Sequence, residues 1–313
     1  MVEKARTYRS AFGRAGRALA ASAALVSILA AQPAQADWKA DVGKLRIGMV
    51  AKPGAGAMVA GVASLERAYS RALGFPVAIF VARDFPALID AQASGRVDYA
   101  IYSATAYVVA ARFCGCIEPI AAPVSLDGAT GTRSVIIVRA GSEPETGALR
   151  IGIAGEGELP LALLSPAVAN ASAPRPGFIS VPVADAQEAE SLFVDGKLDG
   201  LVGWAPARDG AGESQEGGSF ERLARRGLAS ADIEVAWASD AMRFGPHAIR
   251  ADVPADLKDA LRRFLVGLKA SDPDVYDILE EERQGGFAPV SAADYAALGA
   301  LLGTVAGDEA PIP

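Results

Sequence analysis

The chain has 313 residues, a net charge of −7 and a pI of about 5.0. Its length suffices for one large domain or two of ordinary size. An acidic chain without a basic block beyond its first seventeen residues is a poor partner for nucleic acid. One histidine and two cysteines exclude dense Cys/His metal sites and leave few catalytic arrangements open.

The first 36 residues have the three-part pattern of a cleavable secretory signal. A basic segment is followed by an apolar run over 18–31, and Ala34-Gln35-Ala36 offers small residues for cleavage before Asp37. The apolar run is shorter than the roughly twenty residues of a membrane span, and no cysteine for lipid attachment follows it. We therefore expect a soluble mature chain in the periplasm.

The mature chain contains the same strand twice. Residues 45–50 read LRIGMV and residues 149–154 read LRIGIA. Both segments are apolar without alternation, which is typical of strands in a parallel sheet covered on both faces. Each runs into a loop rich in glycine, at 52–56 and at 155–160.

A second repeated unit follows each of these strands. Its pattern is a short helix, a glycine that ends the helix, a basic and an apolar residue, an aspartate, a buried strand and a turn. The two copies comprise helices 88–94 and 188–195, glycines Gly95 and Gly196, strands 96–101 and 197–202, and turns 102–106 and 203–207. Two copies of one unit predict two α/β lobes, with ligand-binding loops at the carboxyl ends of the strands.

The remaining segments connect these lobes. We expect lobe I to comprise 37–139 and 238–313 and lobe II to comprise 140–237, with hinges near 140–146 and 237–240. The strands expected at 135–139 and 233–237 would lead out of and back to lobe I. From Pro254 onward the apolar residues have helical spacing, so this tail should pack back on lobe I.

The order and spacing of several motifs resemble the phosphate/phosphite/phosphonate-type substrate-binding proteins of ABC importers. The matching stretches are 45–48, 95–98, Tyr102, 106–107, 127–128, 133–138, 252–257, 286–290 and 294–295. The resemblance implies the type 2 periplasmic binding fold, an α/β architecture of two lobes with mixed sheets flanked by helices and two crossing hinge strands. It also implies a small oxyanion ligand and an ABC permease as partner.

The first group of candidate ligand contacts follows from this resemblance. Tyr102, Ser103 and Thr105 stand at the start of a helix, where free N–H groups and hydroxyls favour an anion. Ser103 and Thr105 could equally serve as helix caps. Arg133 and Ser134 match a stretch whose neighbourhood lines the cleft in the family.

The second group departs from the family pattern. Glu156 and Gly157 lie where phosphonate-binding members have a turn rich in Ser and Thr. A carboxylate facing a dianion would repel it, so either Glu156 points away or the ligand is not a phosphate-like dianion. Trp204 could stack on a ligand or close the lobe interface. His247 could contact a ligand near the hinge or be a satisfied structural residue.

Cys114-Gly115-Cys116 is the other departure, and three interpretations remain open. The pair could form a structural disulfide at the end of the helix from Ala104, as paired cysteines of exported proteins usually do. The pair could be two free thiols. It could also bind a thiophilic ligand such as arsenite, as in some similar periplasmic sensors.

The main functional hypothesis is a monomeric solute receptor that docks on an ABC permease. The alternative is a periplasmic sensor of the same fold that signals to a histidine kinase. We expect no enzyme, cofactor or metal site, because no Ser-x-x-Lys motif and no second histidine is present. Asp98 and Asp199 form a tempting carboxylate pair, but their repeated position at strand starts predicts structural roles.

Overall fold

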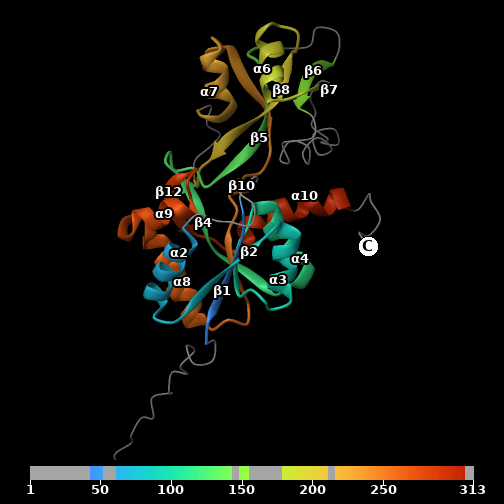
Figure 1. Cartoon of the computed structure of the whole chain (residues 1–313). Coiled ribbons are helices and arrows are strands. Elements are labelled where there is room, and N and C mark those ends of the chain that lie inside the picture. The colour runs from blue at the N-terminus through green and yellow to red at the C-terminus, as the bar shows by residue number, and fades with distance from the viewer. Residues whose placement is uncertain (1–42, 52–60, 143–147, 155–177, 211–215, 307–313) are drawn as a thin grey trace, which may run out of the picture. The chain divides into compact units, whose positions relative to one another are not determined.

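The fold is described here from a computed structural model, shown in Figure 1. It describes residues 43–51, 61–142, 148–154, 178–210 and 216–306. Their strands form two six-stranded sheets, each flanked by helices. This confirms the α/β class with two mixed sheets. Among these residues, no helix has the length and apolar character that crossing a membrane requires.

The first sheet has the strand order β12-β4-β11-β3-β1-β2. Its strands are β1 (Leu45–Val50), β2 (Val77–Ala82), β3 (Tyr99–Ile101), β4 (Ile117–Ser125), β11 (His247–Arg250) and β12 (Gln284–Pro289). β1 pairs in parallel with β2 and β3, whereas β11 and β12 pair antiparallel with their neighbours. The sheet is therefore built from both halves of the sequence.

Helices cover both faces of this sheet because its strands are apolar on both sides. One face packs on α2 (Val62–Leu73), α8 (Ala255–Ser271) and α9 (Pro273–Leu279). The other face packs on α3 (Phe85–Ala93), α4 (Ala104–Cys114) and α10 (Ala296–Ala306), as Figure 1 shows for α3 and α4. The buried leucines of α8 confirm that the tail after Pro254 is helical and packs on the first sheet.

The second sheet has the order β10-β5-β8-β6-β7, and β9 also pairs with β5. Its strands are β5 (Gly131–Arg139), β6 (Leu149–Ala154), β7 (Phe178–Val183), β8 (Gly200–Ala207), β9 (Ile233–Ala238) and β10 (Met242–Arg243). Helices α6 (Ala186–Val194) and α7 (Gly218–Arg225) pack on one face. Two short 3-10 helices, η1 (Ser230–Asp232) and η2 (Ala292–Tyr295), complete the described elements.

The repeated unit of the sequence is a repeated structure. The side chains of Asp84 and Asp185 cap α3 and α6 in the same way, each accepting the N–H three residues later. Gly95 and Gly196 follow these helices with φ of 72° and 73°, as helix-ending glycines do. The predicted helix–glycine–strand unit is thereby confirmed in both halves.

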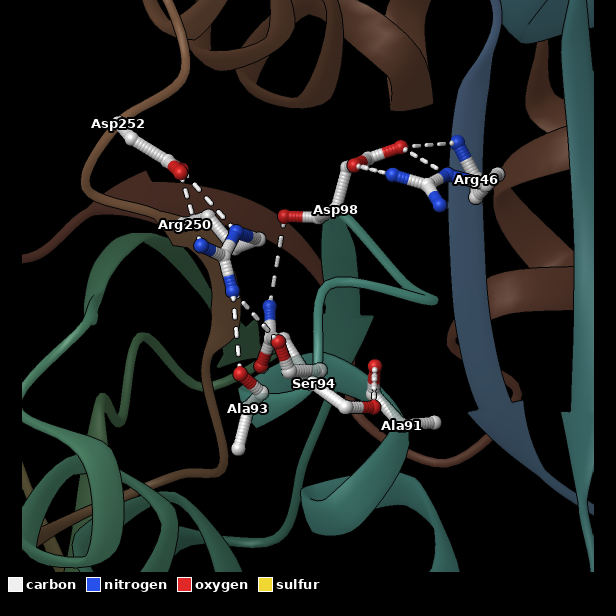
Figure 2. A network of polar contacts seen from close by, with 8 residues as sticks. Arg46, Ala91, Ala93, Ser94, Asp98, Arg250 and Asp252 are labelled. Atoms are coloured by element: carbon white, nitrogen blue, oxygen red, sulfur yellow. Dashed lines mark hydrogen bonds and ion pairs between the residues drawn. The ribbon is translucent and has the colours of Figure 1, made fainter.

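The aspartate of each unit binds the arginine of the repeated LRIG strand, which is β1 in the first half and β6 in the second. Asp98 accepts the backbone N–H and the guanidinium of Arg46. Figure 2 shows this pair beside Arg250, which donates to the carboxylate of Asp252 and to the carbonyl of Gln92 at the end of α3. Asp199 binds Arg150 in the same manner as Asp98 binds Arg46. Both aspartates therefore have structural roles, as their repeated position predicted.

One predicted turn was wrong. The sequence placed a turn at 203–207, but β8 continues through Ala207. The reason is non-local, because β8 pairs antiparallel with β5 over eight consecutive residues from Gly200 to Ala207. Trp204 therefore lies within a strand.

The connections between the two sheets also differ from the expected hinges. β5 pairs along its length with β8 and β9, so residues 131–139 belong to the second sheet rather than to the first. The chain passes from one sheet to the other at 126–130, between β4 and β5, and at 244–246, between β10 and β11. Phe244 donates its N–H to the carbonyl of Thr130, so these two connecting segments lie side by side.

Candidate ligand-binding site

The amino end of α4 carries the first group of candidate residues. Ser103 caps the helix, and its hydroxyl accepts the N–H of Ala106 at 3.1 Å. The first turn holds no acidic residue. In contrast, α3 and α6 are capped by aspartates. Among the described helices of eight or more residues, α4 alone combines an uncharged side-chain cap with a first turn free of carboxylates.

The two neighbours of Ser103 have different environments. Thr105 lies in the first turn of α4 and is half-buried. Tyr102 is only 4% exposed, and its hydroxyl donates to the side-chain oxygen of Gln92 at 2.9 Å. Burial raises the pKa of this phenol well above its usual range. The hydroxyl of Tyr102 is therefore occupied within the protein, whereas Ser103 is exposed.

The start of α4 lies against one connection between the sheets. The N–H of Tyr102 donates to the carbonyl of Pro246 at 3.1 Å. A side chain on Gly245 would meet the carbonyl of Tyr102 at 2.0 Å and the Cα of Ser103 at 2.7 Å. Only glycine fits here without a backbone shift. The connection at 244–246 thus fixes the position of the helix start.

The second sheet carries Arg133, Ser134 and Trp204 on β5 and β8. Ser134 is directly opposite Trp204 in the antiparallel ladder, so their side chains lie on the same face. Arg133 is opposite Ala205 and therefore on the other face. Arg133 is half-buried, and no residue in the described part of the chain forms an ion pair with it.

Ser134 is fully buried, yet no residue in the described ranges forms a hydrogen bond with its hydroxyl. Its backbone is well satisfied, because its N–H donates to the hydroxyl of Ser239 and its carbonyl accepts the N–H of the same residue. Trp204 is half-buried, with the guanidinium of Arg222 5.8 Å from the centre of its ring. No sequence pattern indicated a buried hydroxyl without a described hydrogen-bond partner at this position.

His247 lies in the interior of the first sheet and is 1% exposed. Its Nδ1 bonds the hydroxyl of Tyr99, which in turn lies 3.1 Å from the hydroxyl of Tyr69. The ring packs edge-on against Phe287. Burial lowers the pKa of the imidazole from 6.5 to about 3. These contacts give His247 the structural role that the sequence left open beside ligand contact.

The other candidates lie elsewhere. Glu156 and Gly157 fall outside the residues that the structure describes. Cys114 and Cys116 form a disulfide at the carboxyl end of α4. The helix has 11 residues, so the bridge lies about 16 Å along its axis from Ser103. No group of three or more potential metal ligands occurs among the described residues.

One arginine near the connecting segments was missed by the sequence reasoning. Arg243 in β10 contacts the carboxylates of Asp209, after β8, and Asp294, in η2. The carboxylates come from segments 85 residues apart (294 − 209), so no local pattern signals this arrangement. In the sequence, this contact is indicated by no more than the position of Arg243 directly before Phe244-Gly245-Pro246.

Comparison with known proteins finds a family model that matches this chain. A family model described as "ABC transporter, phosphonate, periplasmic substrate-binding protein" matches residues 47–149 and 215–295. The two segments hold 184 residues (103 and 81), which is more than half of the chain. The match includes β1, α3 and α4 of the first sheet and the returning strands β9 and β11.

Solved structures show more distant similarity. A binding protein component of an ABC phosphonate transporter from Pseudomonas aeruginosa is 17% identical, with 86% of this chain and 90% of that chain covered at a TM-score of 0.44. PhnD1 from Prochlorococcus marinus in complex with methylphosphonate is 12% identical, with 84% and 98% covered at 0.47. A putative sulfonate-binding protein from Methylobacillus flagellatus is 19% identical, with 74% and 70% covered at 0.40.

Proposed function

Because this chain belongs to the family of periplasmic substrate-binding proteins of phosphonate ABC transporters, we propose that it captures a phosphonate or a similar phosphorus oxyanion at the start of α4. The family implies a periplasmic location and a small-molecule ligand that is passed to an ABC permease. The protein's task is binding and release, without chemistry on the ligand.

One observation carries the choice of α4. Its amino end presents the N–H groups of the first turn together with an exposed serine hydroxyl, and no carboxylate stands there. The positive end of the helix dipole favours an anion at such a terminus. The aspartate caps of α3 and α6 would repel the same ligand. We therefore assign Ser103 and Thr105 as ligand contacts.

Arg133 is proposed as the cationic partner of the oxyanion. A half-buried guanidinium that no described residue pairs would gain most from a bidentate contact with a phosphonate. Ser134 is fully buried, and Trp204 lies on the opposite face of the sheet from Arg133, so neither belongs to the proposed contact of Arg133 with the ligand. Glu156 and Gly157, outside the described residues, stay candidates for the second side of the site. Tyr102 supports the start of α4 through Gln92 rather than through the ligand.

The two-lobe division is also part of the proposal. One lobe would contain the first sheet and the other the second sheet, with the segments 126–130 and 244–246 as hinges. A ligand held by both lobes would favour the closed form by its higher affinity for that form. Residues 1–36 would be removed as the signal peptide, and the mature chain would act as a monomer.

A thermal-shift experiment tests this function. The mature chain is melted alone and with methylphosphonate, phosphite, phosphate or sulfate. A ligand that binds only the folded state raises Tm, so at least one phosphorus oxyanion should raise Tm by several degrees. An unchanged Tm with all of these anions would overturn the proposal.

Two variants test the residue assignment. Arg133→Gln should weaken binding of the best oxyanion at least tenfold. The matched control is Arg263→Gln, which removes the same charge from an exposed position on α8. An equal effect of both changes would mean that net charge, not a contact from Arg133, controls binding.

The sensor alternative has no specific support. The two cysteines that it would use are joined in a disulfide in this structure. The matching family consists of binding proteins of ABC transporters, so ligand binding for transport stays the proposed function.

A further inference from the structure

The Cys114–Cys116 bridge joins residues that other contacts already hold in place. Cys114 is the last residue of α4, and the cap residue Gly115, at φ 58°, donates its N–H to Ala111. The carbonyl of Cys116 accepts the N–H of Ala251 at 2.7 Å. A bridge across a sequence separation of two closes so short a loop that it removes little entropy from the unfolded chain. The disulfide therefore contributes little to the stability of the fold.

The bridge is also accessible. Gly115 is exposed, and a methyl group added to it would meet no atom within 4 Å. Cys114 and Cys116 are half-buried, so neither is enclosed in the core. Exposed disulfides are the ones that exchange with external thiols, whereas structural disulfides are usually protected. Access and weak stabilisation together distinguish this bridge from a structural crosslink.

An apolar pair lies next to the bridge. Phe113 is 69% exposed and Val109 is 46% exposed. Their spacing of four residues places them on the same face of α4. Phe113 immediately precedes Cys114, so a partner that covers the phenyl ring would bring its own reactive group close to the bridge. Most exposed apolar residues need no explanation, but this pair adjoins the segment that holds both cysteines of the chain.

We propose that Cys114–Cys116 is a reversible thiol–disulfide exchange site for a protein dithiol, which docks on Phe113 and Val109. One thiolate of the dithiol attacks a bridge sulfur, forming a mixed disulfide and expelling the other bridge sulfur as a thiolate that takes a proton. The second thiol of the dithiol then attacks the mixed disulfide and releases the second cysteine. The bridge gains two electrons and two protons, and the dithiol becomes a disulfide.

The experiment uses the folded mature chain and reduced thioredoxin as the dithiol. Samples are quenched in acid, and their thiols are alkylated with a polyethylene-glycol maleimide and counted on a gel. Two thiols per chain should appear within minutes without denaturant, and oxidised glutathione should restore the bridge. Labelling that appears only after the protein is unfolded by denaturant would overturn the proposal.

A matched pair of variants tests the docking face. Phe113→Ser should slow reduction by thioredoxin at least fivefold and leave reduction by dithiothreitol within twofold of the original rate. Val266→Ser is the control, since Val266 is an exposed apolar residue on α8 with nearly the exposure of Val109 (44% against 46%), and it should change neither rate. A Phe113→Ser variant that reacts with thioredoxin at the original rate would contradict docking at Phe113.

A third variant tests whether the fold needs the disulfide. Cys114→Ser with Cys116→Ser should keep the Tm within a few degrees of the oxidised protein and keep the oxyanion-induced rise in Tm. A variant that fails to fold would show that the bridge is structural, which would also overturn the proposal. The phosphonate-binding function is tested by other residues and does not depend on this result.

Discussion

Arg46 and Asp98 form a pair that closes the amino end of the first sheet by four hydrogen bonds. The carboxylate of Asp98 accepts both the backbone N–H and the guanidinium of Arg46, and the N–H of Asp98 donates back to the carbonyl of Arg46. Arg150 and Asp199 repeat every one of these contacts in the second sheet. The two halves of the protein thus share one arrangement of hydrogen bonds, which joins β1 to β3 and β6 to β8.

The two pairs should differ in energy because they differ in exposure. The side chain of Asp98 is 10% exposed and that of Asp199 is 34% exposed. Asp98→Asn should lower the free energy of unfolding by about 1–3 kcal/mol, and Asp199→Asn by less, about 1 kcal/mol or below. Urea unfolding measures both changes. Equal losses would contradict the effect of exposure, and a loss of ligand affinity in either variant would contradict the structural role.

The single histidine should make stability depend on pH. Burial lowers the pKa of His247 from 6.5 to about 3, so the unfolded state binds the proton more readily than the folded state. The full stability, with His247 unprotonated in both states, is present above pH 6.5, and the part linked to His247 is lost as pH falls toward 3. The free energy of unfolding should fall by up to about 1.4 kcal/mol per pH unit in that range.

The range from pH 5.5 to 7 isolates this effect, because carboxylates titrate mainly below it and the chain has no second histidine. Urea unfolding across the range measures the slope. His247→Gln removes the titrating group and should flatten the slope even if it lowers the overall stability. A slope that persists in this variant would assign the effect to another group.

Ser134 should tolerate the loss of its hydroxyl. Because this buried hydroxyl makes no hydrogen bond, Ser134→Ala should leave the free energy of unfolding unchanged or raise it by about 1 kcal/mol. Ser239→Ala is the contrasting variant, since its hydroxyl accepts the N–H of Ser134 and donates to the carbonyl of Asp240. That change should be destabilising. If Ser134→Ala is the more damaging of the two, the hydroxyl has a partner in solution.

Tyr102 should affect stability rather than binding. Tyr102→Phe leaves the buried side-chain oxygen of Gln92 without its donor, so the free energy of unfolding should fall by about 1–3 kcal/mol. The affinity for the best oxyanion should stay within twofold, as measured by calorimetry. A tenfold loss of affinity with unchanged stability would return this hydroxyl to the ligand.

Local patterns predicted much of this fold. The repeat of LRIG, the helix-ending Gly95 and Gly196, and the helical spacing after Pro254 all depend on contacts within one element or its immediate neighbour. The length of β8 and the membership of β5 in the second sheet depend on pairing between strands far apart in sequence. The predicted turn at 203–207 was therefore wrong, while the hinge positions stay a prediction.

The candidate site was predicted less completely than the fold. A polar residue before a helix indicates a cap, and Ser103 is one. The same pattern could not show that the hydroxyl of Tyr102 turns inward to Gln92 or that His247 bonds Tyr99. Both outcomes depend on residues brought together only by the packing of α3 on the sheet and by the pairing of β11 with β3 within it.

The most direct test of the central claim is calorimetric titration of Ser103→Asp with methylphosphonate, or with whichever oxyanion raises Tm most. Aspartate caps a helix as well as serine does, so the fold and Tm should be unchanged, while the added negative charge should weaken oxyanion binding at least tenfold. Asp185→Ser, the reverse exchange at the cap of α6, is the control and should leave the affinity unchanged. An affinity of Ser103→Asp within twofold of the original would show that the start of α4 does not hold the ligand.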